Sequence, residues 1–220
     1  MSKLLEKEIE QLRRKIMALS VLVEEGVVRA IKALNERDEI LAREVLSSDE
    51  EIDRIEVEIE EDCLKILALH QPVASDLRYI IAMLKINADL ERIGDLAVNI
   101  AHRAKSVARI KGTVPKLDFD GMAKRVRVML LDSLKAMIDL NPELARKVCS
   151  SDDEIDDLNR TLHRELVAMI QKHPDQAETL TYYMSVARNL ERIGDHATNI
   201  AEDVIYLVEG DIVRHSLKLN

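Results

Sequence analysis

Apolar residues return every three or four positions along most of the chain. Near its start they follow one another at alternating four- and three-residue steps: Leu5, Ile9, Leu12, Ile16, Leu19 and Val23. Because an α-helix makes one turn in about 3.6 residues, this spacing places one apolar stripe along a single helix. The stripe continues through Ile31 and Leu34. The pattern therefore predicts a long, coiled-coil-like first helix.

The chain carries one helical segment twice. Residues 90–101 and 190–201 differ only at Leu96/His196 and at Val98/Thr198. An earlier segment, residues 45–53, returns in similar form at 148–156, so the spacing between copies falls from 103 residues to 100. The shorter spacing indicates a small deletion in the second copy, near prolines that mark a turn. The repeat predicts two homologous halves, residues 1–111 and 112–220, joined near 111–115, where Gly and Pro interrupt the helical pattern.

Each half is predicted to contain three long helices, which gives an all-α fold of two homologous three-helix bundles in tandem. The second and third helices are expected at residues 49–69 and 75–109, and again at 152–172 and 175–208. Asp38 and Asn141 precede short apolar-periodic stretches, so a short capped helix is expected in the first connection of each half. Short connections between antiparallel neighbours favour an up-down-up bundle.

Composition narrows the class of protein. An aromatic content of 2%, no Trp and a charged fraction of 33% are typical of long helices packed side by side. A net charge of −9 argues against a nucleic-acid partner. Cys63 and Cys149 are not equivalent in the repeat and form no Cys-x-x-Cys pair, so no disulfide framework is expected. The charged N-terminus and the lack of a long apolar run predict a cytoplasmic protein without direct membrane insertion.

The repeated segment places oxygen donors in a row along one side of a helix. Glu91, Asp95 and Asn99 stand four residues apart, opposite the apolar sector, and the second copy repeats them as Glu191, Asp195 and Asn199. Like charges at this spacing repel by a few tenths of a kcal/mol unless a positive charge offsets them. Oxygen donors suit magnesium, manganese, calcium or iron, with zinc also possible. The rows predict metal sites on the outer faces.

Further candidate ligands are Glu60 on the second helix and its counterpart His163. An alternative interpretation needs no metal, because Arg92 and Arg192 each stand three residues before the aspartate and could pair with it. Exposed pairs of this kind are common and contribute little to stability. Both interpretations remain open from the sequence.

Gly94 and Gly194 interrupt good helix formers at a cost of about 1 kcal/mol each relative to Ala, which indicates close approach of another helix. Catalytic signals are weaker. The sequence has no Glu-x-x-His pair of a di-metal oxidase, no glycine-rich phosphate loop and no serine elbow. A non-enzymatic protein is therefore expected, and a metal-dependent enzyme is the alternative.

Upstream of the acidic row, the same sector of the third helix is apolar and holds Leu77, Ile81 and Leu84. Such a surface is expected to be covered, either by a neighbouring segment or by another subunit. A homodimer that uses these three residues is the default expectation.

The paired Leu-Glu-Arg-Ile-Gly-Asp segments, the Ser-Asp-Leu-Arg run at 75–78 after Gln71-Pro72, and residues 187–202 closely resemble the PhoU family over nearly the whole chain. The resemblance implies a pair of three-helix bundles in a cytosolic accessory protein of high-affinity phosphate uptake. It also implies negative regulation of the phosphate-starvation response. The expected partners are the ATPase subunit of the phosphate transporter and a membrane sensor histidine kinase.

The family's Glu-or-Asp-x-x-x-Asp motif is associated with multinuclear binding of divalent or trivalent metal ions. In this chain it falls on Glu91 with Asp95 and on Glu191 with Asp195. The two copies depart from one another nearby, because His163 replaces Glu60 and Glu202 replaces His102. The two sites are therefore not expected to bind the same ion or the same number of ions.

Overall fold

The computed structural model describes residues 3–110 and 119–211, and within these ranges it contains α-helices and one short 3₁₀ turn but no strand. The first half comprises α1 (Lys3–Glu36), α2 (Glu39–Ser47), α3 (Asp49–His70) and α4 (Ala74–Ala108). The second comprises α5 (Asp120–Asp139), α6 (Pro142–Ser150), α7 (Asp152–Lys172), the 3₁₀ turn η1 (Pro174–Gln176) and α8 (Ala177–Glu209). The predicted all-α fold with six long helices is confirmed.

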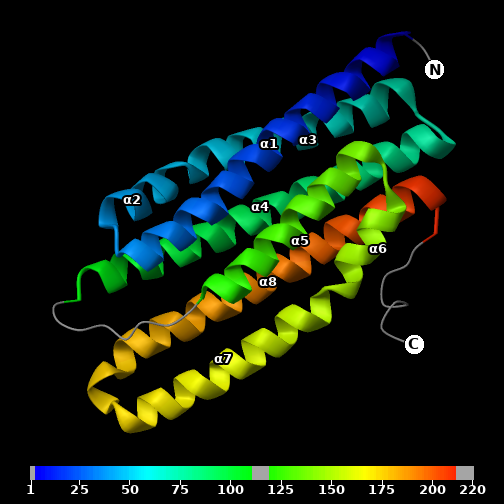
Figure 1. Ribbon diagram of the computed structural model, residues 1–220. Coiled ribbons are helices and arrows are strands. Elements are labelled where there is room, and N and C mark those ends of the chain that lie inside the picture. The colour runs from blue at the N-terminus through cyan, green and yellow to red at the C-terminus, as the bar shows by residue number, and fades with distance from the viewer. Residues whose placement is uncertain (1–2, 111–118, 212–220) are drawn as a thin grey trace.

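The last helices of the two halves, α4 and α8, lie side by side through the middle of the molecule (Figure 1). On one side α4 packs against α1 and α3, and on the other α8 packs against α5 and α7. The buried apolar side chains form one cluster that runs through both halves rather than two separate cores. The predicted junction at 111–115 lies outside the described residues, so the boundary between residues 1–111 and 112–220 stays a prediction.

Both short helices begin where the sequence predicted them. The side chain of Asp38 accepts hydrogen bonds from the backbone N–H groups of Ile40 and Leu41, each at 2.9 Å. In the second half, Asn141 accepts one from the N–H of Leu144 at 3.0 Å. These bonds satisfy backbone donors that have no partner within the first turn of a helix.

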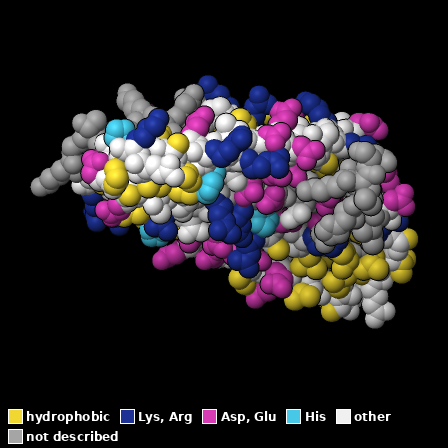
Figure 2. All heavy atoms as spheres, turned by 90° about the horizontal axis from the view of Figure 1, so that it is seen from below, with side chains coloured by type: hydrophobic (Ala, Val, Ile, Leu, Met, Phe, Trp, Pro, Cys, Tyr) yellow, Lys and Arg dark blue, Asp and Glu magenta, His cyan; other side chains and the backbone are white. Residues whose placement is uncertain are grey.

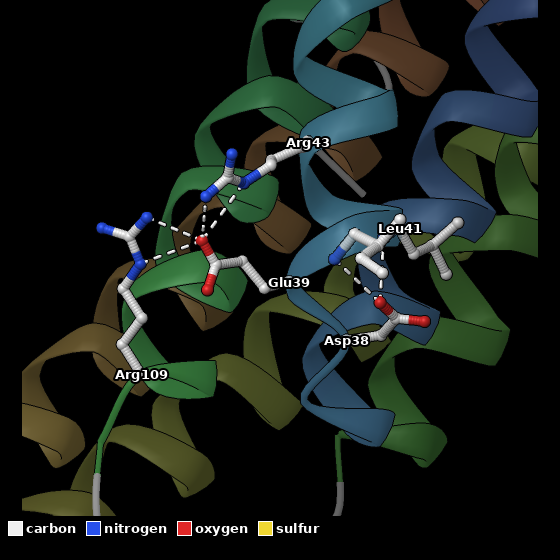
Figure 3. A network of polar contacts seen from close by, with 6 residues as sticks. Asp38, Glu39, Leu41, Arg43 and Arg109 are labelled. Atoms are coloured by element: carbon white, nitrogen blue, oxygen red, sulfur yellow. Dashed lines mark hydrogen bonds and ion pairs between the residues drawn. The ribbon is translucent and has the colours of Figure 1, made fainter.

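The start of α2 is also tied to the end of α4. Glu39 Oε1 accepts a hydrogen bond from Arg109 Nη2 and another from Arg43 Nη2, each at 2.6 Å (Figure 3). The guanidinium of Arg109, and then that of Arg43, holds the pKa of Glu39 well below its ordinary value, at about 2. One carboxylate therefore joins two helix ends that are 70 residues apart in the sequence.

The predicted start of the last helix at residue 175 is wrong by two residues. Pro174–Gln176 form η1, and α8 begins at Ala177. His173 has φ −132° and ψ 68°, outside the helical region. A residue before proline is sterically disfavoured in the helical conformation, so α7 ends before Pro174 and the chain makes a tight turn there.

The glycines of the repeated segment lie beneath isoleucines of a neighbouring helix, which confirms the predicted close approach. A Cβ added at Gly94 of α4 would lie 3.3 Å from both Cδ1 and Cγ2 of Ile52 on α3. The corresponding atom at Gly194 of α8 would lie 3.5 Å from Cγ2 of Ile155 on α7. The two crossings are alike, but the first is tighter.

We expect Gly194→Ala to stabilise the fold by up to about 1 kcal/mol, because alanine favours the helix and the added methyl group meets Ile155 at an ordinary contact distance. Gly94→Ala should gain less, because its methyl group crowds two atoms of Ile52. Urea unfolding of the two variants tests this difference. An equal increase in the free energy of unfolding at both positions would show that the closer contact at Gly94 does not reduce the gain from alanine.

Candidate functional site

The packing of α4 against α8 is antiparallel and contains two polar pairs at matching places. Lys85 Nζ of α4 lies 3.0 Å from Asp203 Oδ1 of α8. Farther along, Arg103 Nε of α4 donates to Ser185 Oγ at 3.3 Å. The side chain of Asp203 is only 2% exposed, and the ammonium group of Lys85 helps to compensate its buried charge. We refer to this contact between α4 and α8 as the seam.

Between these pairs, Asp89 receives two contacts from α8. His196 Nδ1 lies 2.7 Å from Asp89 Oδ1, and Asn199 Nδ2 donates to the same oxygen at 3.1 Å. The structure thus places Asn199, a predicted ligand of an outer metal site, against α4 in the seam. Its counterpart Asn99 is exposed. The sequence analysis had not singled out Asp89.

In the first half, carboxylates of α3 and α4 meet in what we call the first acidic cluster: Asp49, Asp53, Glu56, Glu91 and Asp95. Burial raises the pKa of Glu91, and the negative charges of Asp95, Glu56 and Asp53 raise it further. Burial likewise raises the pKa of Asp49, followed by the charges of Asp53 and Asp95. The α3 carboxylates on either side of Ile52 therefore lie near the predicted pair Glu91 and Asp95.

The second half holds the equivalent residues Asp152, Asp156, Asn159, Glu191 and Asp195, which we call the second acidic cluster. Burial raises the pKa of Glu191, and so do the charges of Asp195 and Asp156. Here, however, neutral donors hold two of the carboxylates. Thr198 Oγ1 donates to Asp152 at 3.2 Å, and Asn159 opposes in small part the rise in the pKa of Glu191.

The other two predicted ligands lie at the edges of these clusters. Glu60 is exposed, and its charge raises the pKa of Glu56 after the larger effect of burial. His163 is exposed and lines an open surface depression together with Asn159 and Arg160. Neither residue is brought against the glutamate and aspartate of the repeated motif.

The donors fit a hard cation in their chemistry, but they do not form a finished coordination shell. Across residues 3–110 and 119–211, no three His, Cys, Asp or Glu side chains are gathered so that they could hold a metal ion as they stand. Arg92 supplies part of the compensating charge in the first acidic cluster, 3.3 Å from Glu91 and 3.2 Å from Asp95. Its side chain is 60% exposed. A cation would compete with this arginine for the same oxygens.

The outer surface carries charges of both signs. Lys and Arg side chains alternate with Asp and Glu over much of the face in Figure 2, while apolar side chains gather at one end of it. Of the residues predicted to form a dimer interface, Leu77 is 39% exposed, Ile81 is half-buried, and Leu84 packs against the core. The chain itself thus covers part of this sector, and the dimer stays a prediction. None of the described helices is long and apolar enough to cross a membrane.

Comparison with known proteins accounts for both halves. The PhoU domain matches the chain twice, at residues 5–104 and at residues 119–204. The chain belongs to the PhoU family. Among its relatives, the phosphate-specific transport system accessory protein PhoU homologue of Aquifex aeolicus is 41% identical over 209 residues, which cover 95% of each chain. The homologue of the same name in Pseudomonas putida is 42% identical over 94% of this chain and 82% of its own.

Two solved PhoU structures share the fold. The crystal structure of PhoU from Pseudomonas aeruginosa superposes with a TM-score of 0.91 at 39% identity, covering 94% of this chain and 99% of the other. The phosphate transport system regulatory protein PhoU from Streptococcus pneumoniae superposes with a TM-score of 0.88 at 29% identity, covering 95% and 99% of the two chains. The resemblance to the PhoU family and the tandem fold are confirmed.

We expect Glu91→Gln to raise the melting temperature of chelator-treated protein by a few degrees at most. Because burial and neighbouring carboxylates raise the pKa of Glu91, its ionised form near neutral pH opposes folding, and a neutral amide removes that opposition. Glu58→Gln is the control, because that carboxylate lies 3.4 Å from Lys15 rather than in the first acidic cluster. If Glu91→Gln lowers the melting temperature instead, the negative charge of Glu91 must already be balanced by groups of the protein itself, without a bound cation.

Proposed function

We propose that this chain is a cytoplasmic accessory protein of phosphate uptake that represses the phosphate-starvation response through contacts with other proteins. The observation that carries this proposal is the match of nearly the whole chain to relatives named phosphate-specific transport system accessory proteins. One of the solved structures is that of a phosphate transport system regulatory protein. These names favour regulation over the alternative of a metal-dependent enzyme acting on phosphate compounds.

The proposed partners are the ATPase subunit of the phosphate transporter, the membrane sensor histidine kinase of the phosphate response, and a second copy of the chain. Regulation by contact suits a surface on which long, rigid helices present fixed patterns of charge. The acidic clusters are the proposed docking determinants, because they hold negative charge at defined places on α3, α4, α7 and α8. Electrostatic complementarity of this kind contributes mainly to specificity and to the rate of association.

Metal binding is the second part of the proposal. Glu91 and Asp95, with carboxylates of α3, would hold a divalent or trivalent cation in the first half, and Glu191 with Asp195 would do so in the second. The bound cation would neutralise the mutual repulsion of these groups and so change the charge that a partner meets. Iron, manganese, magnesium and zinc are the candidate ions.

The double variant Asp95→Asn, Asp195→Asn should lose most of the metal that the wild-type chain binds, because each change replaces a charged oxygen donor by a neutral one. Metal analysis of protein purified without chelators measures the loss, and circular dichroism should show unchanged helicity. The matched control is Glu58→Gln with Glu165→Gln, which removes two charges from α3 and α7 outside the acidic clusters. Equal metal content in both double variants would contradict the assignment.

Deleting the gene for this chain should leave phosphate-starvation genes expressed when phosphate is plentiful, and restoring the wild-type chain should silence them. A reporter gene under a phosphate-starvation promoter measures the effect. If the acidic clusters act in docking, the Asp95→Asn, Asp195→Asn chain should fail to silence the reporter although it accumulates normally.

The outcomes separate the two parts of the proposal. Normal repression in the deletion strain would overturn the regulatory role. Full silencing by the double variant would instead leave repression in place and remove the acidic clusters from it.

A further inference from the structure

The outer sides of α3 and α7 occupy equivalent places in the repeat but differ in chemistry. Positions separated by three, four and seven residues lie on one side of a helix, so four such residues form a single face. On α3 this face, which we call the α3 face, consists of Val57, Glu60, Glu61 and Leu64. The matching α7 face consists of Arg160, His163, Arg164 and Val167. All eight residues are exposed.

The α3 face carries negative charge that the chain itself does not neutralise. The ion pairs that Lys15 makes with α3 use Glu58 and Asp62, at 3.4 and 2.8 Å, which lie beside this face. Within the described residues, Glu60 and Glu61 have no cationic partner of their own. Two carboxylates of the α3 face are therefore available to a positive surface.

The α7 face carries positive charge, in a chain whose net charge is −9. Arg160 lies 2.5 Å from Asp157, but both side chains are about two-thirds exposed, and such surface pairs contribute little. Arg164 donates only to the neutral Thr161 Oγ1, at 3.3 Å. The α7 face therefore offers two guanidinium groups to a negative surface.

Packing within the chain does not dictate the chemistry of either face. Both helices bury the side that carries Ile52 or Ile155, over Gly94 or Gly194, and both turn the face under discussion outward. The same crossing is thus made with carboxylates on one outer face and with guanidinium groups on the other. Each face also keeps exposed apolar area, since Leu64 is 54% exposed.

The two faces of one molecule do not meet. Helices α3 and α7 lie on opposite sides of the α4 and α8 pair (Figure 1). Among the described residues, α3 packs only against α1, α2 and α4, whereas α7 packs only against α5, α6, α8 and η1. The complement of each face is therefore found on another copy of the chain.

We propose that the α3 face of one molecule binds the α7 face of a second copy, so that chains associate head to tail. An antiparallel alignment of the two helices sets Glu60 against Arg164 and Val57 against Val167. Because the faces point to opposite sides of the molecule, this contact is heterologous and does not close on itself, and a third copy can add in the same way.

This inference rests on the proposed partnership with a second copy and assigns that contact to a surface other than Leu77, Ile81 and Leu84. Each face covers only about two turns of one helix, less than the roughly 800 Å² per partner of a stable interface. The association is therefore weak. Salt weakens it further, because exposed charges are screened beyond about 8 Å at physiological ionic strength.

Sedimentation equilibrium of the full chain at low and at high salt tests the contact. At low salt the average mass of the wild-type chain should rise with concentration beyond that of a dimer, and at high salt it should fall toward that of a monomer. Glu60→Lys with Glu61→Lys should weaken association at least tenfold, because like charges then face each other. Glu25→Lys with Glu36→Lys makes the same change of charge at exposed positions of α1 and should not weaken it.

A charge exchange keeps the test independent of damage to the fold. Arg160→Glu with Arg164→Glu should also weaken association at least tenfold. An equal mixture of the two charge-reversed chains should associate again, because the reversed α3 face of one then meets the reversed α7 face of the other. Failure of this mixture to associate would overturn the pairing of the two faces.

The remaining outcomes separate this contact from the proposed homodimer. Association that stops at a dimer, is unchanged by both reversals and is lost in Leu84→Glu would place the second copy on the apolar sector and overturn the head-to-tail contact. A wild-type chain that stays a monomer at every concentration would contradict the second copy as a partner, and this inference with it. Neither result bears on repression, which the reporter gene measures separately.

Discussion

The antiparallel contact between α4 and α8 is the constraint on which the rest of the structure depends. Each of the other long helices packs against one of these two, and the buried apolar cluster is continuous across them. The seam also buries the carboxylate of Asp203, and Lys85, 3.0 Å away, helps to compensate its charge. Neither half could expose its third helix to water without uncovering this apolar surface. The duplicated segments therefore act as one unit.

The seam also decides which parts of the repeated motif can reach a ligand. Because one side of α4 and α8 is occupied by the partner helix, the carboxylates of Glu91 and Glu191 are directed to the sides where α3 and α7 cross. Those crossings pass over Gly94 and Gly194, where the absence of a side chain lets Ile52 and Ile155 approach closely. The residues that flank each isoleucine then meet the motif. Close packing and the gathering of negative charge are thus two results of one geometry.

The sequence predicted most features that depend on local chemistry. The helices, the caps at Asp38 and Asn141 and the close approach at both glycines follow from spacing and residue type, and all of them are present. Contacts between distant segments were harder to predict. The apolar sector that includes Leu84 showed that the third helix is covered on more than one side, but amphipathic spacing does not say by which neighbour.

Polar contacts between helices were also hard to predict from the sequence. Glu60 and His163 were chosen as further ligands because they align in the repeat, whereas the packed helices bring Asp53 and Glu56 to the motif instead. The repeated Ile-Asp pair at 52–53 and 155–156 was the available signal, once the glycines were recognised as a crossing. Asp89 gave no such signal, because it acts through residues of another helix and has a different residue at the equivalent position.

The unequal pairs along the seam have a consequence for assembly of a duplicated protein. Lys85 faces Asp203 across the seam, and the first-half residue equivalent to Asp203 is Arg103. If α4 paired in the same register with the α4 of another molecule, Lys85 would face Arg103, and two positive charges would lie opposite one another. The correct pairing with α8 replaces this repulsion by attraction. Divergence of charge between the two copies thus lets a newly made first half discriminate its own second half from the first half of a neighbouring chain.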